Sequence, residues 1–300
     1  MEVHPDTIAA LVERSPVLVT GGAGYLGSAL QDCLREHEIS HRAVDIRTDE
    51  AAFRVDLLDA EATRRAFADV KPGIVVHCAT GSALAYRDRL LETAQTDLTI
   101  LRNVLATMPY RSRLVYLSSS YVYSGGTGTD ALSEGTPLHP QHNFGVGKLF
   151  FEEVITRTHP QSVIFRLCSV FGPGRSSFPN AVTQFADEAR EKGRIAIWGS
   201  GSRMTQYVHI DDVLRHVLGA ARIPFGVYNL GGDDYLSVAD TAAIIADAAG
   251  ADVVYERDRA EGETLPFLDT RKLREASGEG FLPTRPAIRD YVTRVLSRVP

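Results

Sequence analysis

The feature that most constrains the fold is a glycine-rich segment that follows a short apolar run and leads into a helical pattern. The apolar run, residues 17–20, reads Val-Leu-Val-Thr, and the next seven residues read Gly-Gly-Ala-Gly-Tyr-Leu-Gly. Leu26, Leu30 and Leu34 then recur at helical spacing on one face. Strand, loop and helix in this order predict the start of a β-α-β unit, in which backbone N–H groups and the helix dipole can hold a phosphate group.

The glycines of this loop have separate roles if the ligand is the pyrophosphate of a dinucleotide. Gly21 and Gly24 would let the backbone approach the phosphates, and Gly27 would let the helix pack closely on the sheet. Tyr25 and Leu26 lie between them and are expected to contact the same ligand. Glycines also serve ordinary tight turns, so the flanking strand and helix, rather than the spacing alone, favour a dinucleotide site.

Apolar runs alternate with helical patterns through the first half of the chain. Such strands need right-handed crossovers and therefore form a parallel sheet covered on both faces. We predict an α/β fold with a doubly wound parallel sheet (Rossmann) over residues 1–172, which includes a short N-terminal helix over 5–14. Beyond it, mixed helices and strands predict a smaller mixed α/β substrate lobe over residues 173–300. The expected strands are 17–20, 41–45, 53–57, 74–78, 113–118 and 162–167 in the larger domain, and 195–198, 226–230 and 253–255 in the smaller lobe.

Composition and charge argue against several other classes of protein. Of the 300 residues, 32 are Lys or Arg and 38 are Asp or Glu, without a basic stripe, so we expect no nucleic-acid partner. No apolar run reaches the ~18 residues of a membrane span, and residues 1–16 lack a signal-peptide pattern, so we expect no membrane association. Cys33, Cys78 and Cys168 lie far apart. Such an odd, scattered set predicts neither a disulfide framework nor a metal site, and it favours the reducing cytoplasm.

An acidic residue at the end of the second predicted strand bears on the choice of cofactor. A carboxylate at Asp45 would accept hydrogen bonds from the adenosine ribose hydroxyls and repel a 2′-phosphate, which favours NAD over NADP. Arg47 lies two residues further on and is the type of residue that a 2′-phosphate favours, so NADP stays open as the less favoured cofactor.

Further motifs fall, with the glycine loop, in the order of a known family. They are Asp56-Leu57, Leu114-Val115-Tyr116-Leu117-Ser118-Ser119-Ser120, Lys148, Arg166-Leu167-Cys168-Ser169-Val170-Phe171-Gly172-Pro173-Gly174 and Tyr207-Val208-His209-Ile210-Asp211-Asp212. On these motifs the chain resembles the extended short-chain dehydrogenases/reductases, and within them the NAD-dependent epimerase/dehydratase family that modifies nucleotide-activated sugars. The resemblance covers nearly the whole chain. It implies further cofactor contacts from Asp56, Leu57, Ala79 and Lys148.

The resemblance also implies a catalytic trio of a Ser or Thr, a Tyr and a Lys, with the last two spaced Y-x-x-x-K. In that chemistry a hydride passes between sugar and nicotinamide while the tyrosine moves the proton at the sugar oxygen. The free tyrosine pKa of about 10 is lowered by the nearby lysine and nicotinamide charges. Ser119 and Lys148 match two members of the trio, but Phe144 occupies the tyrosine position and has no hydroxyl.

Two explanations compete for Phe144. One is a Tyr→Phe substitution engineered to trap substrate, which we favour because Lys148 and the serines are retained. The other is a natural member that has lost this acid/base or replaced it with Tyr121 or Tyr123, although packing at the strand end is the default interpretation of both. Loss of the general acid/base should cost roughly 10²- to 10⁴-fold in rate, so this chain should bind well and turn over poorly.

Neighbouring residues narrow the reaction and the substrate. The family's 4,6-dehydratases place an acid pair after the Ser/Thr, where this chain has Ser120 and Tyr121, so dehydration is disfavoured. A 4-epimerase, a ketoreductase or a dehydrogenase needs only the trio and NAD. The resemblance implies a nucleotide-diphosphate sugar as substrate, contacted by Ser120, Asn180, Arg203 and Arg259, and a homodimer. The family's phosphate-binding arginine position holds Thr205, so Arg203 is expected to replace that arginine.

The leading interpretation is therefore an NAD-dependent epimerase or oxidoreductase that transfers hydride at a carbon of a nucleotide-activated sugar, at C4 by the family's pattern. Two alternatives stay open: a non-redox member that binds NAD(H) and regulates a partner, and a reductase of a small ketone without a nucleotide. His209 resembles a catalytic histidine, but its run is expected to start a helix that Asp211 or Asp212 caps.

Overall fold

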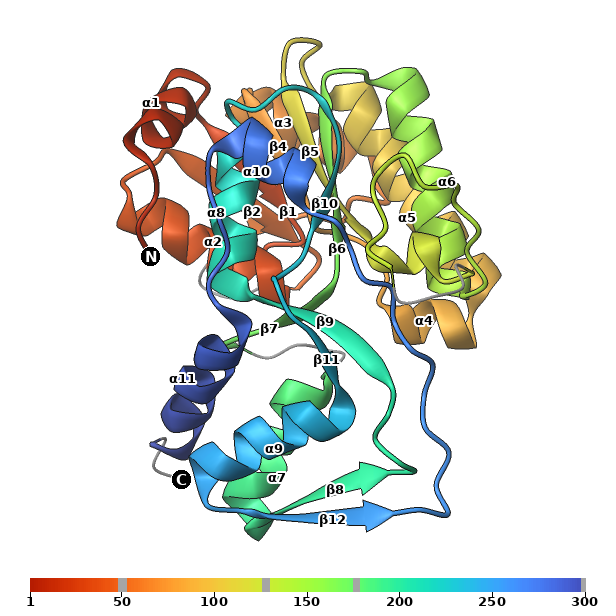
Figure 1. The fold of residues 1–300 in the computed structure, drawn as a ribbon. Coiled ribbons are helices and arrows are strands. Elements are labelled where there is room, and N and C mark those ends of the chain that lie inside the picture. The colour runs from red at the N-terminus through yellow and green to blue at the C-terminus, as the bar shows by residue number, and fades with distance from the viewer. Residues whose placement is uncertain (48–52, 126–129, 175–178, 298–300) are drawn as a thin grey trace.

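Seven parallel strands form the central layer of the larger lobe (Figure 1). The computed structural model describes residues 1–47, 53–125, 130–174 and 179–297. Across the sheet the order is β10-β6-β5-β4-β1-β2-β3, and every pairing is parallel. The strands are β1 Val17–Thr20, β2 His41–Asp45, β3 Phe53–Arg54, β4 Ile74–His77, β5 Arg113–Ser119, β6 Ser162–Leu167 and β10 Gly226–Leu230.

The strand order reverses at β1, which positions the glycine loop. After β1 the chain adds β2 and β3 on one side, and then returns to add β4, β5 and β6 on the other. Thr20 at the end of β1 lies beside Val44 of β2 and His77 of β4. Ligands of open α/β sheets bind in the crevice at such a switch point, beyond the carboxyl ends of the strands. The glycine loop, which begins at Gly21, therefore starts at the edge of this crevice.

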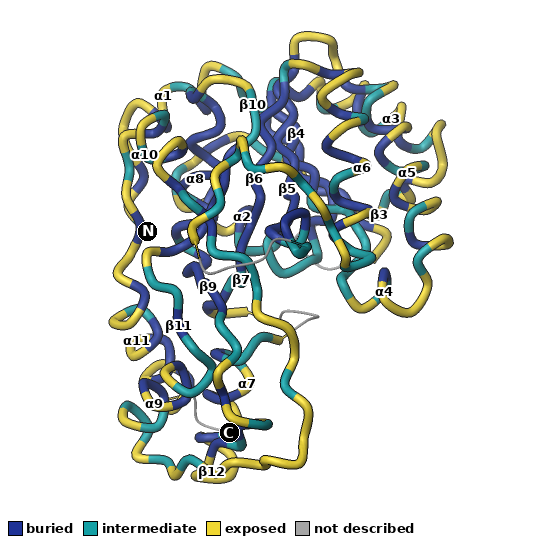
Figure 2. Tube along the Cα trace, turned by 45° about the vertical axis from the view of Figure 1, so that its right-hand side comes forward, coloured by how far each residue is buried: buried dark blue, intermediate teal, exposed yellow. Residues whose placement is uncertain are grey.

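Helices cover both faces of the sheet, so every position of its central strands β1, β4, β5 and β6 is buried. Within β1, Val17 and Val19 pack into the core under α1, α2 and α8, whereas Leu18 packs into the core under α3, α5 and α6. Figure 2 shows the central strands buried between these layers. The helices of this lobe are α1 Pro5–Glu13, α2 Tyr25–Glu36, α3 Ala60–Val70, α4 Ala83–Asp88, α5 Leu90–Thr107, α6 Asn143–Thr158, α8 Ile210–Gly219 and α10 Arg271–Ser277, with a 3-10 turn η1 at Ser120–Tyr123.

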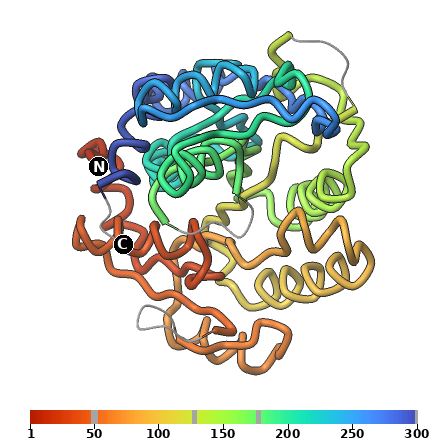
Figure 3. The backbone as a smooth tube through the Cα atoms, turned by 90° about the horizontal axis from the view of Figure 1, so that it is seen from below, coloured from red at the N-terminus to blue at the C-terminus, as the bar shows by residue number. Residues whose placement is uncertain are grey.

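The smaller lobe has its own apolar core and lies beyond the carboxyl ends of the large sheet (Figure 1). It contains a mixed three-stranded sheet, β11-β9-β7, and a parallel pair, β12-β8. Figure 3, seen from below, shows the C-terminal segments in teal and blue on one side and the N-terminal segments in red and orange on the other. The elements of the smaller lobe are β7 Ser169–Phe171, α7 Ala181–Lys192, β8 Arg194–Trp198, β9 Met204–His209, β11 Tyr235–Ser237, α9 Val238–Ala249, β12 Asp252–Glu256 and α11 Thr284–Leu296.

One strand lies elsewhere than the sequence indicated. Residues 226–230 were expected in the smaller lobe, but they form β10, which pairs with β6 at the edge of the large sheet. Tyr228 and Leu230 are buried in the larger core, so this edge position removes their apolar surface from water. The chain beyond residue 172 therefore supplies the smaller lobe and also β10, α8 and α10 of the larger lobe.

Neither a membrane-spanning helix nor a cluster of metal ligands is present in the described ranges. No helix there is both long and apolar enough to cross a bilayer. The same ranges contain no group of three or more His, Cys, Asp or Glu side chains that could hold a metal ion.

Candidate functional site

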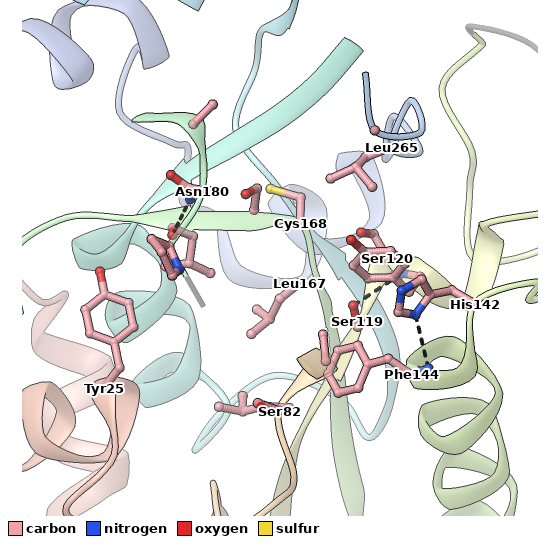
Figure 4. Close-up of a pocket in the computed structure, with 18 of the residues that line it drawn as sticks. Tyr25, Ser82, Ser119, Ser120, His142, Phe144, Leu167, Cys168, Asn180 and Leu265 are labelled. Atoms are coloured by element: carbon pink, nitrogen blue, oxygen red, sulfur yellow. Dashed lines mark hydrogen bonds between the residues drawn. The ribbon is translucent and has the colours of Figure 1, made fainter. Parts of the chain in front are cut away.

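A cavity of about 690 Å³ lies between the two lobes, beyond the carboxyl ends of the central strands. The glycine loop, the end of β5, the start of α6 and segments of the smaller lobe line it. Figure 4 shows Tyr25 on one side of this cavity and Ser119, His142 and Phe144 together on the other. Residues predicted for cofactor, catalysis and substrate that line it are Gly21, Gly24, Tyr25, Leu26, Gly27, Ser119, Ser120, Phe144, Lys148, Asn180 and Arg203.

The glycine loop turns so tightly that side chains would not fit at two of its positions. Gly21 has a φ of +70°, and a Cβ there would lie 2.7 Å from the backbone of Cys78 and Ala79. A Cβ at Gly27 would lie 2.2 Å from the carbonyl oxygen of Gly21. Gly24 caps α2 without a side chain, so the first N–H groups of the helix have no side-chain acceptor. Bare backbone and free N–H groups at a helix start are what a pyrophosphate requires.

Four other predicted cofactor residues are not part of the cavity lining in the described ranges. Asp45 is buried and accepts hydrogen bonds from the amides of Ala23 (3.0 Å) and Arg47 (2.9 Å), so it braces the glycine loop. Asp56 accepts from the amide of Leu58, and Leu57 packs in the core. The backbone of Ala79 packs against Gly21 so closely that a Cβ on Gly21 would lie 2.7 Å from the nitrogen of Ala79. Their contact with a cofactor stays a prediction.

Lys148 is buried beneath the cavity and is held by three oxygens. Its Nζ donates to the carbonyl of Leu117 (2.8 Å), to Oγ1 of Thr80 (3.1 Å) and to the hydroxyl of Tyr116 (3.4 Å). Burial lowers the pKa of Lys148 to about 8, although the nearby carboxylate of Asp97 opposes this change. The amino group is therefore fixed in place, and at a mildly basic pH near this pKa it is protonated in only part of the molecules.

Phe144 lies in the first turn of α6, one helical turn before Lys148. Its ring packs edge-on against Tyr86 and Tyr121, with centroids 5.6 Å and 6.1 Å away, and lies 5.3 Å from Nζ of Lys148. These contacts hold the ring at the cavity, but the ring carries no group that can give or take a proton. Ser119, Phe144 and Lys148, the residues predicted for the catalytic trio, thus all line the cavity, and their catalytic roles stay a prediction.

The three serines at the end of β5 differ in what they can do. Ser118 donates to Glu152, a buried carboxylate that is also paired with Arg166, so this hydroxyl is committed to the interior. Ser119 accepts a hydrogen bond from the amide of Tyr121 at 3.3 Å, which leaves its own proton available to a ligand. All three serines line the cavity, so their hydrogen bonds, and not their position, distinguish them. The geometry favours Ser119 over Ser118 for contact with a substrate oxygen.

The two tyrosines considered as replacements for the missing hydroxyl are also unequal. Tyr123 is buried, and its hydroxyl is bonded to Arg166 (2.6 Å) and Asn229 (3.0 Å), so it belongs to the interior network. Tyr121 lines the cavity beside Phe144. Burial raises the pKa of Tyr121, while Arg203 opposes the rise and Glu263 adds to it, so the phenol is neutral at pH 7.

The predicted substrate residues of the smaller lobe are not all at the cavity. Asn180 lines it, but its side chain caps α7 and donates to the carbonyl of Val170 at 2.8 Å. Arg203 also lines it, and its Nε is buried without a partner among the described residues. Arg259 is not among the cavity-lining residues; it lines an adjoining groove, where its guanidinium lies 4.7 Å from the ring of Trp198 and pairs with Glu256 at 2.9 Å. A direct substrate contact from Arg259 stays a prediction.

Sequence reasoning missed several polar groups that line the cavity, among them Glu261 and His142. Glu261 accepts hydrogen bonds from the amides of Gly201 (2.8 Å) and Arg203 (2.9 Å) and from the amide and hydroxyl of Ser200, and these bonds, led by that hydroxyl, lower its pKa to about 2. His142 caps α6 by accepting from the amide of Phe144. The only signal for His142 was its place two residues before Phe144. His209 similarly caps α8 itself, a role expected of Asp211 or Asp212, and is not among the cavity-lining residues.

Comparison with known proteins gives three findings. Residues 17–231 match the model of the NAD dependent epimerase/dehydratase family. The chain is 28% identical over 308 residues to dTDP-L-rhamnose 4-epimerase of Burkholderia thailandensis, covering 82% of this chain and 84% of that one. It is also 25% identical over 311 residues to methionine adenosyltransferase 2 subunit beta of Xenopus laevis, covering 97% of this chain and 90% of that one.

A solved structure has the same fold. The UDP-glucose 4-epimerase of Thermus thermophilus, in complex with NAD, is similar with a TM-score of 0.82 at 23% identity, over 94% of this chain and 99% of that one. The predicted doubly wound α/β fold with a smaller mixed lobe is thereby confirmed.

Proposed function

Because the chain belongs to the NAD dependent epimerase/dehydratase family, we propose that it binds NAD together with a nucleotide-diphosphate sugar, as an epimerase or oxidoreductase that transfers hydride at C4 of the sugar. The observation that carries this proposal is that Ser119, Lys148 and the glycine loop line one cavity. The relative named dTDP-L-rhamnose 4-epimerase supports a sugar nucleotide as the substrate class.

The residues at the glycine loop fit a dinucleotide. Any side chain at Gly27 would overlap the carbonyl of Gly21, and the start of α2 offers N–H groups without a side-chain acceptor. Gly21 and Gly24 would let the backbone approach the pyrophosphate, Gly27 would let α2 pack closely, and Asp45 would hold the adenosine ribose, which favours NAD over NADP. When bound, the nicotinamide supplies the hydride acceptor or donor. Lys148 would hold the nicotinamide ribose and add positive charge where an oxyanion develops.

Phe144 sets the expected rate. Ser119 can orient the reacting oxygen, but the group that would exchange its proton is absent, so the chain should bind both ligands and react slowly, by roughly 10²- to 10⁴-fold. That Phe144 is an engineered replacement of tyrosine stays a hypothesis, and it leads to the same expectation.

The test restores the hydroxyl with Phe144→Tyr. We expect NADH absorbance or sugar interconversion with dTDP- or UDP-sugars to rise by roughly 10²-fold or more over the parent chain. Phe225→Tyr is the matched control, because Phe225 is exposed and is not among the cavity-lining residues. If Phe144→Tyr binds NAD but stays inert with every sugar nucleotide, the enzyme proposal fails.

A second candidate is a non-redox subunit that binds NAD(H) and regulates a partner protein. It is favoured by Phe144 and by the relative named as a beta subunit, which aligns over 97% of this chain. An inert Phe144→Tyr that retains NAD binding would favour this candidate. A third, a reductase of a small ketone, would be contradicted by binding of free UDP or dTDP, because such a substrate carries no nucleotide.

We also propose a homodimer, formed through α5 and α6. Leu91 and Leu98 share one face of α5, and Val146 and Phe150 share one face of α6; all four side chains are exposed in the single chain. The two helices are neighbours, so these side chains can form one apolar surface that a second copy would cover.

In the reducing cytoplasm, which we propose as the location, Cys33, Cys78 and Cys168 would stay free thiols, as they are in the structure.

A further inference from the structure

His142 combines a structural bond with a place in the cavity. The amide of Phe144 donates to its Nδ1 at 3.2 Å, which caps the start of α6. A backbone N–H can only donate, so Nδ1 carries no proton. In a neutral imidazole the proton must then be on Nε2, which makes that nitrogen a hydrogen-bond donor.

The surroundings of the ring keep it neutral and leave Nε2 free. Burial lowers the pKa of His142, against the raising effect of Glu263, so the imidazole is uncharged at pH 7. One face of the ring packs on Tyr121, with centroids 4.5 Å apart. Among the described residues Nε2 has no hydrogen-bond partner. Figure 4 shows the ring beside Ser119, Ser120 and Phe144, at the wall of the cavity.

Two other histidines show what capping alone looks like in this chain. His4 caps α1 and His209 caps α8, each by accepting from the amide two residues later at 3.2 Å. Neither is among the residues that line the cavity. A cap therefore accounts for those two positions, whereas His142 in addition directs a donor-bearing ring to the site of the predicted chemistry.

We propose that His142 is a substrate-contacting residue, whose Nε2–H donates a hydrogen bond to an oxygen of the bound sugar beside Ser119, where Phe144 offers no hydroxyl. This role rests on the proposed function, since it needs a sugar in the cavity. Because Nε2 can only donate in this tautomer, the sugar oxygen must accept, as a ketone oxygen does. His142 transfers no proton in this role: it orients the oxygen and stabilises negative charge that develops on it.

Two substitutions separate the cap from the donor. His142→Asn keeps a good capping acceptor and removes the Nε2 donor. His142→Gln keeps an amide donor near the position of Nε2 and gives up the capping acceptor. The measurement is calorimetric binding of dTDP-glucose and UDP-glucose, each compared with free dTDP and UDP, alongside Tm. The Kd of the free nucleotide divided by the Kd of the sugar nucleotide isolates the contribution of the sugar, and this ratio falls when a contact to the sugar is lost.

We expect His142→Asn to lower that ratio by about 2- to 10-fold, the range of one net hydrogen bond, with unchanged Tm and unchanged affinity for the free nucleotides. His142→Gln should retain the ratio and lose Tm, and His209→Asn should leave both unaltered. An unchanged ratio in His142→Asn, or a loss that the free nucleotides share, would overturn the role of His142 alone. A parent chain that binds neither sugar nucleotide would overturn the proposed function, and this role with it. Nitrogen NMR showing the proton on Nδ1 would also overturn it.

Discussion

The buried ammonium of Lys148 gives a stability prediction whose sign and size follow from its surroundings. Burial lowers its pKa in the folded protein from 10.5 to about 8, and solvent barely reaches the side chain. Between these values the unfolded chain binds a proton that the folded chain has released, so stability rises with pH. Below pH 8 both states are protonated and the effect is constant. The full difference corresponds to about 3 kcal/mol, of which about 2.5 kcal/mol is reached at pH 10.

The comparison that isolates this effect is the parent against Lys148→Met. Urea unfolding of both proteins at pH 7, 8, 9 and 10 gives the free energy of unfolding of each. Groups that titrate alike in both proteins cancel in the difference. We expect the parent to gain about 2 to 3 kcal/mol on Lys148→Met between pH 7 and pH 10.

Lys192 supplies the control, because it is an exposed lysine on α7 that pairs with Glu188. The difference between the parent and Lys192→Met should be flat over the same range. A flat difference for Lys148→Met as well would refute the reasoning, because it would mean that the folded and the unfolded protein bind the Lys148 proton equally.

Two further changes test the cofactor loop and the dimer. Gly27→Ala should weaken NAD binding by roughly 10-fold or more in a fluorescence titration, because its Cβ would lie 2.2 Å from the carbonyl of Gly21 and displace the loop; Gly219→Ala, whose Cβ would meet nothing within 4 Å, should bind NAD like the parent. Leu91→Glu should convert a dimer into a monomer in light scattering, because Leu91 is 79% exposed in the single chain; a parent that is already monomeric would contradict the proposed dimer.

The larger lobe could be predicted from sequence because its strands are buried on both faces and read as short apolar runs between helical patterns. The prediction was wrong where local side-chain hydrogen bonds or non-local strand pairing, which such patterns do not reveal, decide the structure. Residues 53–57 were expected to form one strand, but β3 ends at Arg54. Asp56 then accepts from the amide of Leu58, a local turn that competes with the sheet. The edge position of β10 depends on pairing with β6, which lies about sixty residues earlier in the chain.

The candidate site was predictable where one segment supplies both the residue and its environment. The glycine loop and the first turn of α6 are such segments. Arg203 and Arg259 were equivalent in sequence, but the structure separates them. β12 pairs in parallel with β8, with Glu256 opposite Trp198. That pairing is non-local, and it brings the ring of Trp198 to Arg259, whereas the carboxylate of Glu256 lies only three residues before Arg259 in the chain.

Helix caps explain why the remaining site residues resist prediction. A helix start needs a side-chain acceptor for its free N–H groups, and the side chains that serve, such as those of Asn180, His142 and His209, belong to types that also bind substrates. A motif match therefore cannot distinguish the two roles. The two roles are distinguished by whether the side chain has a hydrogen-bonding atom that the cap does not use. The amide of Asn180 is used at both ends, by Thr183 and Val170. In His142 the cap uses Nδ1 alone, and by doing so it fixes the proton on Nε2, so the bond that starts α6 also prepares the donor that the cavity receives.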